Sequence, residues 1–245
     1  MLALTPSSPV GSGLEVLCVG AHCDDIEIGC GGTLLSIQQQ YPTSKVHCLV
    51  LTSTSARKKE ATAATKSLIR PSSRGELRIC DFPDGLLPAH LPAVKAELER
   101  MKGIVRPDLV FTHHGMDRHQ DHSLASQVTW QTFRDHMIWE YEIPKFDGDL
   151  VTPNMYVPLT SALAARKIAL IMRAFRSQFE KSWFTAENLA AVMRVRGLEC
   201  RSASGFAEGF HCRKLTGAFP APKSLRTRSV VAVAKRAVQL RTHNR

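Results

Sequence analysis

Two short segments of the sequence concentrate side chains that bind metals and move protons. The first runs from His22 to Glu27 (HCDDIE), and the second runs from His113 to His122 (HHGMDRHQDH). Each directly follows a short apolar run, 14–21 or 109–112, that is typical of a buried parallel strand. Ligands bind at the carboxyl ends of the strands in such sheets. We therefore expect both segments at one edge of a sheet, where together they indicate a metal site.

A catalytic metal needs three protein ligands and one open position. Two neutral histidines and one carboxylate are a common zinc set, and His22, Asp25 and His122 would supply it. Asp24 would then be left beside the metal, where a free carboxylate can take a proton from metal-bound water. The same ligand types also hold iron, so Fe2+ stays an alternative to Zn2+.

His119 and Asp121 form a further pair in the second segment. The imidazole could stabilise an oxyanion or protonate a leaving amine, and the carboxylate could orient the ring. Plain structural roles remain open for some of these residues. Adjacent carboxylates after a strand favour the positive end of a helix dipole, and Asp121 could cap the helix that follows it.

Alternating strands and helices are expected to position these segments. Apolar runs predict further strands at 46–52, 76–82 and 206–212. Amphipathic patterns predict helices at 31–40, 56–69, 91–105, 123–137, 162–179 and 186–196. The alternation favours a three-layer α/β/α fold with a largely parallel sheet. Residues 141–157 are expected to be loop with a short strand, and to help form a pocket.

The two chemical segments resemble the motifs of a known family. HCDD at 22–25 and GCGGT at 29–33 resemble the HPDD…GCGGT signature of the LmbE-like or PIG-L deacetylases, which are metal-dependent N-acetylglucosaminyl de-N-acetylases. DRHQDH at 117–122 resembles the family motif DxHxDH. Shorter matches occur in the same order within residues 14–215, at 57–60, 82–85, 153–156, 176–178 and 207–210.

This resemblance implies a Rossmann-like fold, a Zn2+ ion and hydrolysis of the acetamide of an N-acetylated amino sugar. It implies metal ligands at His22, Asp25 and His122, a general base at Asp24, and an active-site histidine with its acidic partner at His119 and Asp121. It also implies substrate-binding roles for Arg57 and Asp84.

Cys23 departs from the family pattern because it stands where the family usually has proline. Proline would stiffen this turn by fixing φ. We expect activity to survive the change, whereas metal affinity and sensitivity to oxidation could differ.

The basic excess of the chain is concentrated near its C-terminus. The sequence has 245 residues, with 32 Lys and Arg against 22 Asp and Glu, for a net charge of +10. Residues 221–245 hold seven basic residues and no acidic one, which leaves +3 for the first 220. We therefore predict a flexible leader at 1–13, a deacetylase domain at 14–219 and a basic tail at 220–245 that is disordered or an amphipathic helix.

Composition and charge also limit the compartment and the partners. The hydrophobic content of 44% is that of a globular protein, which excludes a collagen-like or wholly disordered chain. Seven cysteines without a CxxC pair, no signal peptide and no apolar membrane span predict a cytoplasmic protein. The expected partner is a small amino-sugar conjugate. No specific nucleic acid is expected, and the tail could make peripheral contact with an anionic surface.

Two other functions are compatible with part of this pattern. Non-haem Fe(II) oxygenases use two histidines and a carboxylate, but they usually carry them on an all-β barrel. A binding protein with a non-catalytic metal site could dock its basic tail on an anionic membrane or on nucleic acid. The glycines at 29–32 lack the third glycine of a dinucleotide-binding loop, so close packing explains them better.

Overall fold

A computed structural model of the chain describes residues 13–216, so nearly all of the predicted leader and the whole basic tail lie outside the described residues. Seven strands form one sheet in the order β3-β2-β1-β4-β5-β7-β6. Their bounds are Glu15–Gly20, Lys45–Thr52, Arg74–Phe82, Leu109–His113, Met137–Tyr141, Met155–Leu159 and Phe206–His211 for β1 to β7. The first five are parallel, and β7 runs antiparallel to β5 and β6. The predicted α/β class with a largely parallel sheet is confirmed.

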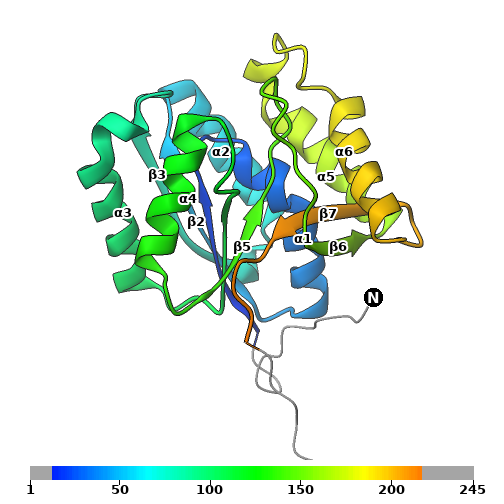
Figure 1. Cartoon of the computed structure of the whole chain (residues 1–245), viewed down its shortest axis with the longest axis horizontal. Helices are drawn as coiled ribbons and strands as arrows, with labels where there is room; N and C mark the ends of the chain where they lie inside the picture. Colours follow the sequence, from blue (N-terminus) through cyan, green and yellow to red (C-terminus); the bar gives the residue numbers. More distant parts are fainter. Residues whose placement is uncertain (1–12, 217–245) are drawn as a thin grey trace, which may run out of the picture. The chain divides into compact units, whose positions relative to one another are not determined.

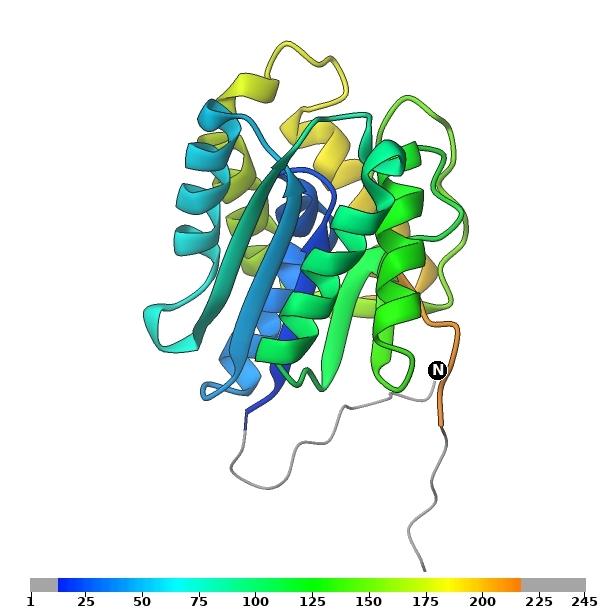
Figure 2. The same ribbon diagram turned by 90° about the vertical axis from the view of Figure 1, so that its left-hand side faces the viewer.

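Helices cover both faces of this sheet (Figures 1 and 2). One face carries α3 (Leu91–Ile104) and α4 (Gln120–Thr132), and the other carries α1 (Asp25–Gln40), α2 (Ser55–Leu68), α5 (Ser161–Ala174) and α6 (Ala186–Glu199). Alternate side chains of β1 enter two separate cores, which explains why its sequence is continuously apolar. Within residues 13–216, no helix is long and apolar enough to cross a membrane.

The first helix begins six residues earlier than the sequence predicts. α1 starts at Asp25 and includes all of the glycines at 29–32. A Cβ atom on Gly29 would overlap the ring of Tyr141, and one on Gly32 would meet Leu159 and Glu208. These glycines therefore lie inside a helix that packs unusually close to its neighbours, where no larger side chain fits.

The second chemical segment also enters its helix earlier than predicted. α4 begins at Gln120 rather than at Ser123, so that Asp121 and His122 lie in its first turn. The helix ends at Thr132, and Met137, the last residue of the predicted helix, begins β5, a strand that the hydrophobic pattern did not predict. A parallel strand next to β4 extends the sheet on the side opposite to β1.

A buried ion pair fixes α1 against the strands and helices on its face. The Glu208 carboxylate accepts hydrogen bonds from the backbone N–H groups of Gly32 and Thr33 at 2.8 and 2.6 Å. The Lys167 ammonium donates to Glu208 Oε1 at 2.6 Å and to the carbonyl of Ile28. Because β7, α5 and α1 all contribute to this network, the helix that starts at the chemical segment is held rigidly.

Candidate metal centre

The two chemical segments meet where neighbouring parallel strands end. β1 leads to α1 on one face of the sheet, and β4, its neighbour, leads to α4 on the other face. Ligands of open α/β sheets bind at such a point, where consecutive connections leave in opposite directions. A cleft of about 640 Å³ lies there, and His22, Asp24, Asp25, His119 and His122 are among its lining residues. The predicted placement of these residues at one sheet edge is therefore observed.

The three side chains of the predicted ligand set lie close together, with Asp25 turning a different oxygen toward each histidine. His22 Nδ1 is 3.0 Å from His122 Nε2 and 3.4 Å from Asp25 Oδ2. His122 Nε2 is 3.7 Å from Asp25 Oδ1. Zinc with bonds of about 2.1 Å would separate tetrahedral ligand atoms by about 3.4 Å. The donor types suit a divalent metal, and the separations between these side chains lie close to that value.

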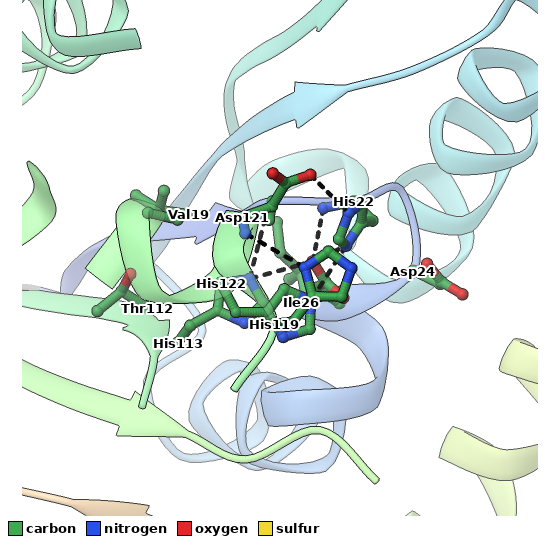
Figure 3. Close-up of polar contacts among 12 residues, drawn as sticks. Val19, His22, Asp24, Ile26, Thr112, His113, His119, Asp121 and His122 are labelled. Atoms are coloured by element: carbon green, nitrogen blue, oxygen red, sulfur yellow. Dashed lines mark hydrogen bonds and ion pairs between the residues drawn. The ribbon is translucent and has the colours of Figure 1, made fainter. Parts of the chain in front are cut away.

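Other donor atoms overlap with this set. Three groups have ligand atoms that all lie within 4.8 Å of one another, and these are His22/His119/His122, Asp25/His113/His122 and His22/Asp84/Asp121. His22 and His122 each occur in two groups, so the arrangement is centred on these two imidazoles. Figure 3 shows the rings of His22, His119 and His122 gathered in one cluster.

Carboxylates contact the far nitrogens of both central imidazoles. His22 Nε2 lies 2.9 Å from Asp84 Oδ1 and 3.2 Å from Asp121 Oδ2, and His122 Nδ1 lies 2.9 Å from Asp117 Oδ2. A carboxylate bound to one ring nitrogen fixes the tautomer and orients the other nitrogen for a metal. Asp117 belongs to a recognised motif, but nothing in the sequence alone had assigned it this role.

Asp121 makes different contacts from those expected. It lies beside His119, but its carboxylate binds His22 and accepts hydrogen bonds from the backbone N–H groups of Gly85 and Leu87. The backbone N–H of Asp121 donates to His119 Nδ1 at 3.2 Å. Its contact with His119 is thus through the main chain, and its carboxylate links the Pro83–Gly85 turn to the centre.

The balance of charge in the centre favours a bound cation. Burial disfavours a charged His22, but Asp25, Asp121 and Asp84 outweigh it and raise the pKa of His22 to about 12. Burial also acts on Asp25, yet the surrounding imidazoles, first among them His113, hold its pKa well below the usual value. Carboxylates with depressed pKa values around a shared imidazole attract either protons or a metal ion.

Asp24 lies to one side of this cluster (Figure 3). Its Oδ1 forms an ion pair with Arg57 Nη2 at 2.6 Å, and Arg57 also contacts Glu60 and Ser177. Burial raises the pKa of Asp24, while the Arg57 charge opposes that rise. The predicted base and the predicted substrate-contacting arginine are therefore direct partners.

The opposite walls of the cleft come from the second half of the chain. Lys145, Phe146, Lys181 and Trp183 line them, and no motif in the sequence had indicated these four residues individually. The segment 141–157 was predicted to contribute to a pocket, and Ile143 to Asp147 do so with the exception of Pro144. Isolated aromatic and basic residues in irregular segments carry no spacing signal, which is why sequence reasoning missed them.

Comparison with known proteins agrees with the resemblance seen in the motifs. Residues 17–133 match the family model described as "PIG-L: GlcNAc-PI de-N-acetylase". The chain is therefore similar to the PIG-L family over this segment. An uncharacterized deacetylase of Escherichia coli (strain K12), YaiS, is 28% identical over 145 residues, which cover 53% of this chain and 74% of that protein.

Solved structures share the fold of this chain. The conserved protein TT1542 from Thermus thermophilus is 26% identical, with a TM-score of 0.66 over 86% of this chain and 99% of that one. The N,N'-diacetylchitobiose deacetylase from Pyrococcus horikoshii is 20% identical, with a TM-score of 0.63 over 81% and 83%. The 4-carboxy-2-hydroxymuconate hydratase GalB, 17% identical over 85% and 100%, has a TM-score of 0.64. The fold alone therefore does not specify deacetylation.

Proposed function

We propose that this chain is a metal-dependent hydrolase that removes the N-acetyl group from an N-acetylated amino sugar in a glycoconjugate. The observation that carries the proposal is the clustering of His22, Asp25 and His122 in the cleft, with closest approaches between their donor atoms of 3.0, 3.4 and 3.7 Å, in a chain that resembles the PIG-L deacetylases. An all-β oxygenase barrel does not fit the parallel sheet.

The metal would be held by these three side chains, and Zn2+ suits the donor set best, with Fe2+ as the alternative. When bound, such an ion polarises a carbonyl group and lowers the pKa of water. Asp24 would accept the proton of the attacking water at its carboxylate. The ion pair with Arg57 opposes protonation of Asp24 and so keeps it competent as a base.

His119 would donate a proton or a hydrogen bond at Nε2. Its Nδ1 accepts a hydrogen bond from the backbone N–H of Asp121, so the proton of the neutral ring lies on Nε2. Burial lowers the pKa of His119, which favours this neutral form. Asp121 would position the centre through its main-chain contact with His119 and its carboxylate contact with His22.

The substrate would lie between the metal centre and the walls of the cleft. Phe146 and Trp183 offer aromatic faces to a sugar ring, as is common for apolar sugar faces. Asp84 is 73% exposed at its side chain, and one of its oxygens remains available to a sugar hydroxyl group. Arg57 also lines the cleft and would contact a substrate oxygen there. All seven cysteines are free, which supports our assignment to the cytoplasm.

The decisive variant is Asp24→Asn, assayed by acetate release from a panel of N-acetylglucosamine conjugates. We expect a fall in kcat of at least about 100-fold with unchanged metal content, because a general base contributes about 10²–10⁴ in rate. The matched control is Asp135→Asn, which changes an exposed carboxylate outside the cleft and should leave the rate unchanged. Full activity of Asp24→Asn, or no acetate from any conjugate with the parent protein, would contradict the proposal.

A further inference from the structure

The small net charge of the described residues conceals a strong separation of charge. Residues 13–216 carry +3 in total. Two stretches within them, 53–75 and 150–179, contain ten basic residues and one acidic residue, and so carry +9. The remainder of the described chain therefore carries −6. The small net charge of residues 13–216 is therefore the sum of two oppositely charged regions. It does not show how charge is distributed over the surface.

The two basic stretches lie next to each other in the fold. They contain α2 and α5, which pack side by side on the same face of the sheet (Figure 2). The start of α2 meets the end of α5, because Arg57 Nη1 donates to Ser177 Oγ at 3.2 Å. We define the basic face as the exposed basic residues of these helices and of the 3-10 turn η3 (Arg176–Gln178): Lys58, Lys59, Lys66, Arg166, Arg173 and Arg176.

No acidic side chain neutralises the basic face. Within the part of the chain that the structure describes, none of its six members forms an ion pair, whereas Arg78 pairs with Glu97 and Lys95 with Glu99 elsewhere. The acidic residue of α2, Glu60, is already bound to Arg57 and Ser177. Such an accumulation of unpaired cations costs stability through mutual repulsion and is relieved by a polyanion.

The surface between the basic side chains is shallow, because small residues lie between the long ones. The small residues exposed on the two helices include Ala63, Ala162, Ala165 and Ala169. A hollow of about 340 Å³ is lined by Lys58, Lys59 and Lys66 together with Thr62 and Ala63. Long basic side chains on such a shallow surface can contact many phosphate groups of a flat anionic surface at the same time.

We propose that the basic face docks the protein on the surface of an anionic phospholipid bilayer. Neither α2 nor α5 contains an aromatic residue, so these helices offer the bases of a nucleic acid no aromatic ring on which to stack. An exposed aromatic residue, Phe179, lies instead just beyond Arg176 and is 51% exposed. Aromatic side chains beside cations suit the boundary between headgroups and acyl chains.

Docking on this face would bring the cleft close to the lipid surface. Arg57, at the start of α2, and Gln178 and Lys181, just after α5, all line the cleft. The cleft therefore opens at the end of the basic face where the two helices meet. This inference concerns where the protein is held and does not depend on the proposed deacetylation.

The test uses the full-length chain and sedimentation with lipid vesicles. Phosphatidylcholine vesicles with about 30% phosphatidylserine should bind the protein, binding should weaken as NaCl rises from about 0.1 to about 0.5 M, and pure phosphatidylcholine should bind weakly. The variant Lys58→Glu/Lys59→Glu should lower the partition coefficient by at least about 30-fold, because each lysine at the surface contributes about 1 kcal/mol.

The matched control is Arg100→Glu/Arg106→Glu, which changes net charge equally on exposed residues of α3 and its end, on the opposite side of the sheet. It should alter partitioning by less than about threefold. Equal losses in both double variants, or equal binding to neutral and anionic vesicles, would overturn the proposal. The proposal would also be overturned if Lys58→Glu/Lys59→Glu lost binding to single-stranded RNA and kept its binding to vesicles, because the basic face would then bind nucleic acid. Circular dichroism checks folding, and acetate release from a soluble substrate should stay at the parent rate.

Discussion

The ion pair between Arg57 and Asp24 should set the acid limb of the pH–rate profile. Their closest atoms are 2.6 Å apart, and the side chains are only 17% and 7% exposed, so solvent screens the pair poorly. Arg57→Met keeps most of the apolar stem and removes the charge. A charge-assisted hydrogen bond contributes about 1.5–3 kcal/mol, which corresponds to about one to two pKa units for the carboxyl group.

The sign of the shift follows from the two opposing effects on Asp24. Burial raises its pKa and Arg57 is the largest of the charges that lower it, so loss of Arg57 removes the main opposing effect and raises the pKa further. A general base must be ionised, and a higher pKa therefore removes activity at low pH while sparing activity at high pH. The acid limb of kcat/KM should move up by about one to two pH units.

The assay is acetate release by metal-loaded protein from about pH 5 to about pH 9, with Arg57→Lys as the matched control. At the acid end, Arg57→Met should be about 10- to 100-fold slower than the parent, and near the alkaline plateau the difference should shrink to the part that comes from the lost substrate contact. Arg57→Lys keeps the charge and should shift the limb less. An equal loss of kcat/KM at every pH would refute this reasoning, because Arg57 would then act on substrate binding alone.

Three further substitutions probe the supports of the centre. Asp117→Asn should weaken metal binding by about 10- to 100-fold in a competition with a chromophoric chelator, because it removes the carboxylate partner of a metal-side imidazole; unchanged affinity would exclude that role. Glu208→Gln should lower the free energy of unfolding in urea by about 3–5 kcal/mol, since it leaves Lys167 buried without its carboxylate. A decrease below about 1 kcal/mol would mean that the amide oxygen satisfies the Lys167 ammonium. Gly29→Ala should cost about 1–3 kcal/mol because its methyl group meets the Tyr141 ring, and a neutral result would require the ring to move freely.

Hydrophobic patterning was sufficient to predict most of the architecture. The apolar runs before His22 and His113 end within one or two residues of β1 and β4, because strands buried on both faces leave no room for polar side chains. The errors occur where tertiary contacts override local preference. The predicted helix start at residue 31 left Gly29 outside the helix, whereas α1 begins at Asp25, and the small size of Gly29 and Gly32 is what allows it to approach its neighbours.

The candidate site likewise contains residues that the sequence motifs predicted and residues that only the tertiary contacts reveal. His22 and Asp25 come from one turn, and His122 comes from a second motif 100 positions away. Their proximity could be predicted because each motif directly follows a strand, and parallel strands end at one edge of the sheet. The Lys145 ammonium lies 3.1 Å from Asp117 and is linked to it across 28 positions of the chain. Nothing local in the sequence marks such a partner, because its role depends on where a distant loop returns.

The two halves of the cleft have separate origins along the chain. Every residue proposed for metal binding or proton transfer lies within the family-matched region 17–133, whereas the walls at 143–147 and 178–183 lie beyond it. Insertions or substitutions in those walls can therefore alter which molecule is admitted without disturbing the reacting groups. Such a layout makes the scaffold evolvable, because acceptance of a new conjugate requires changes only in segments that carry none of the proposed reacting groups.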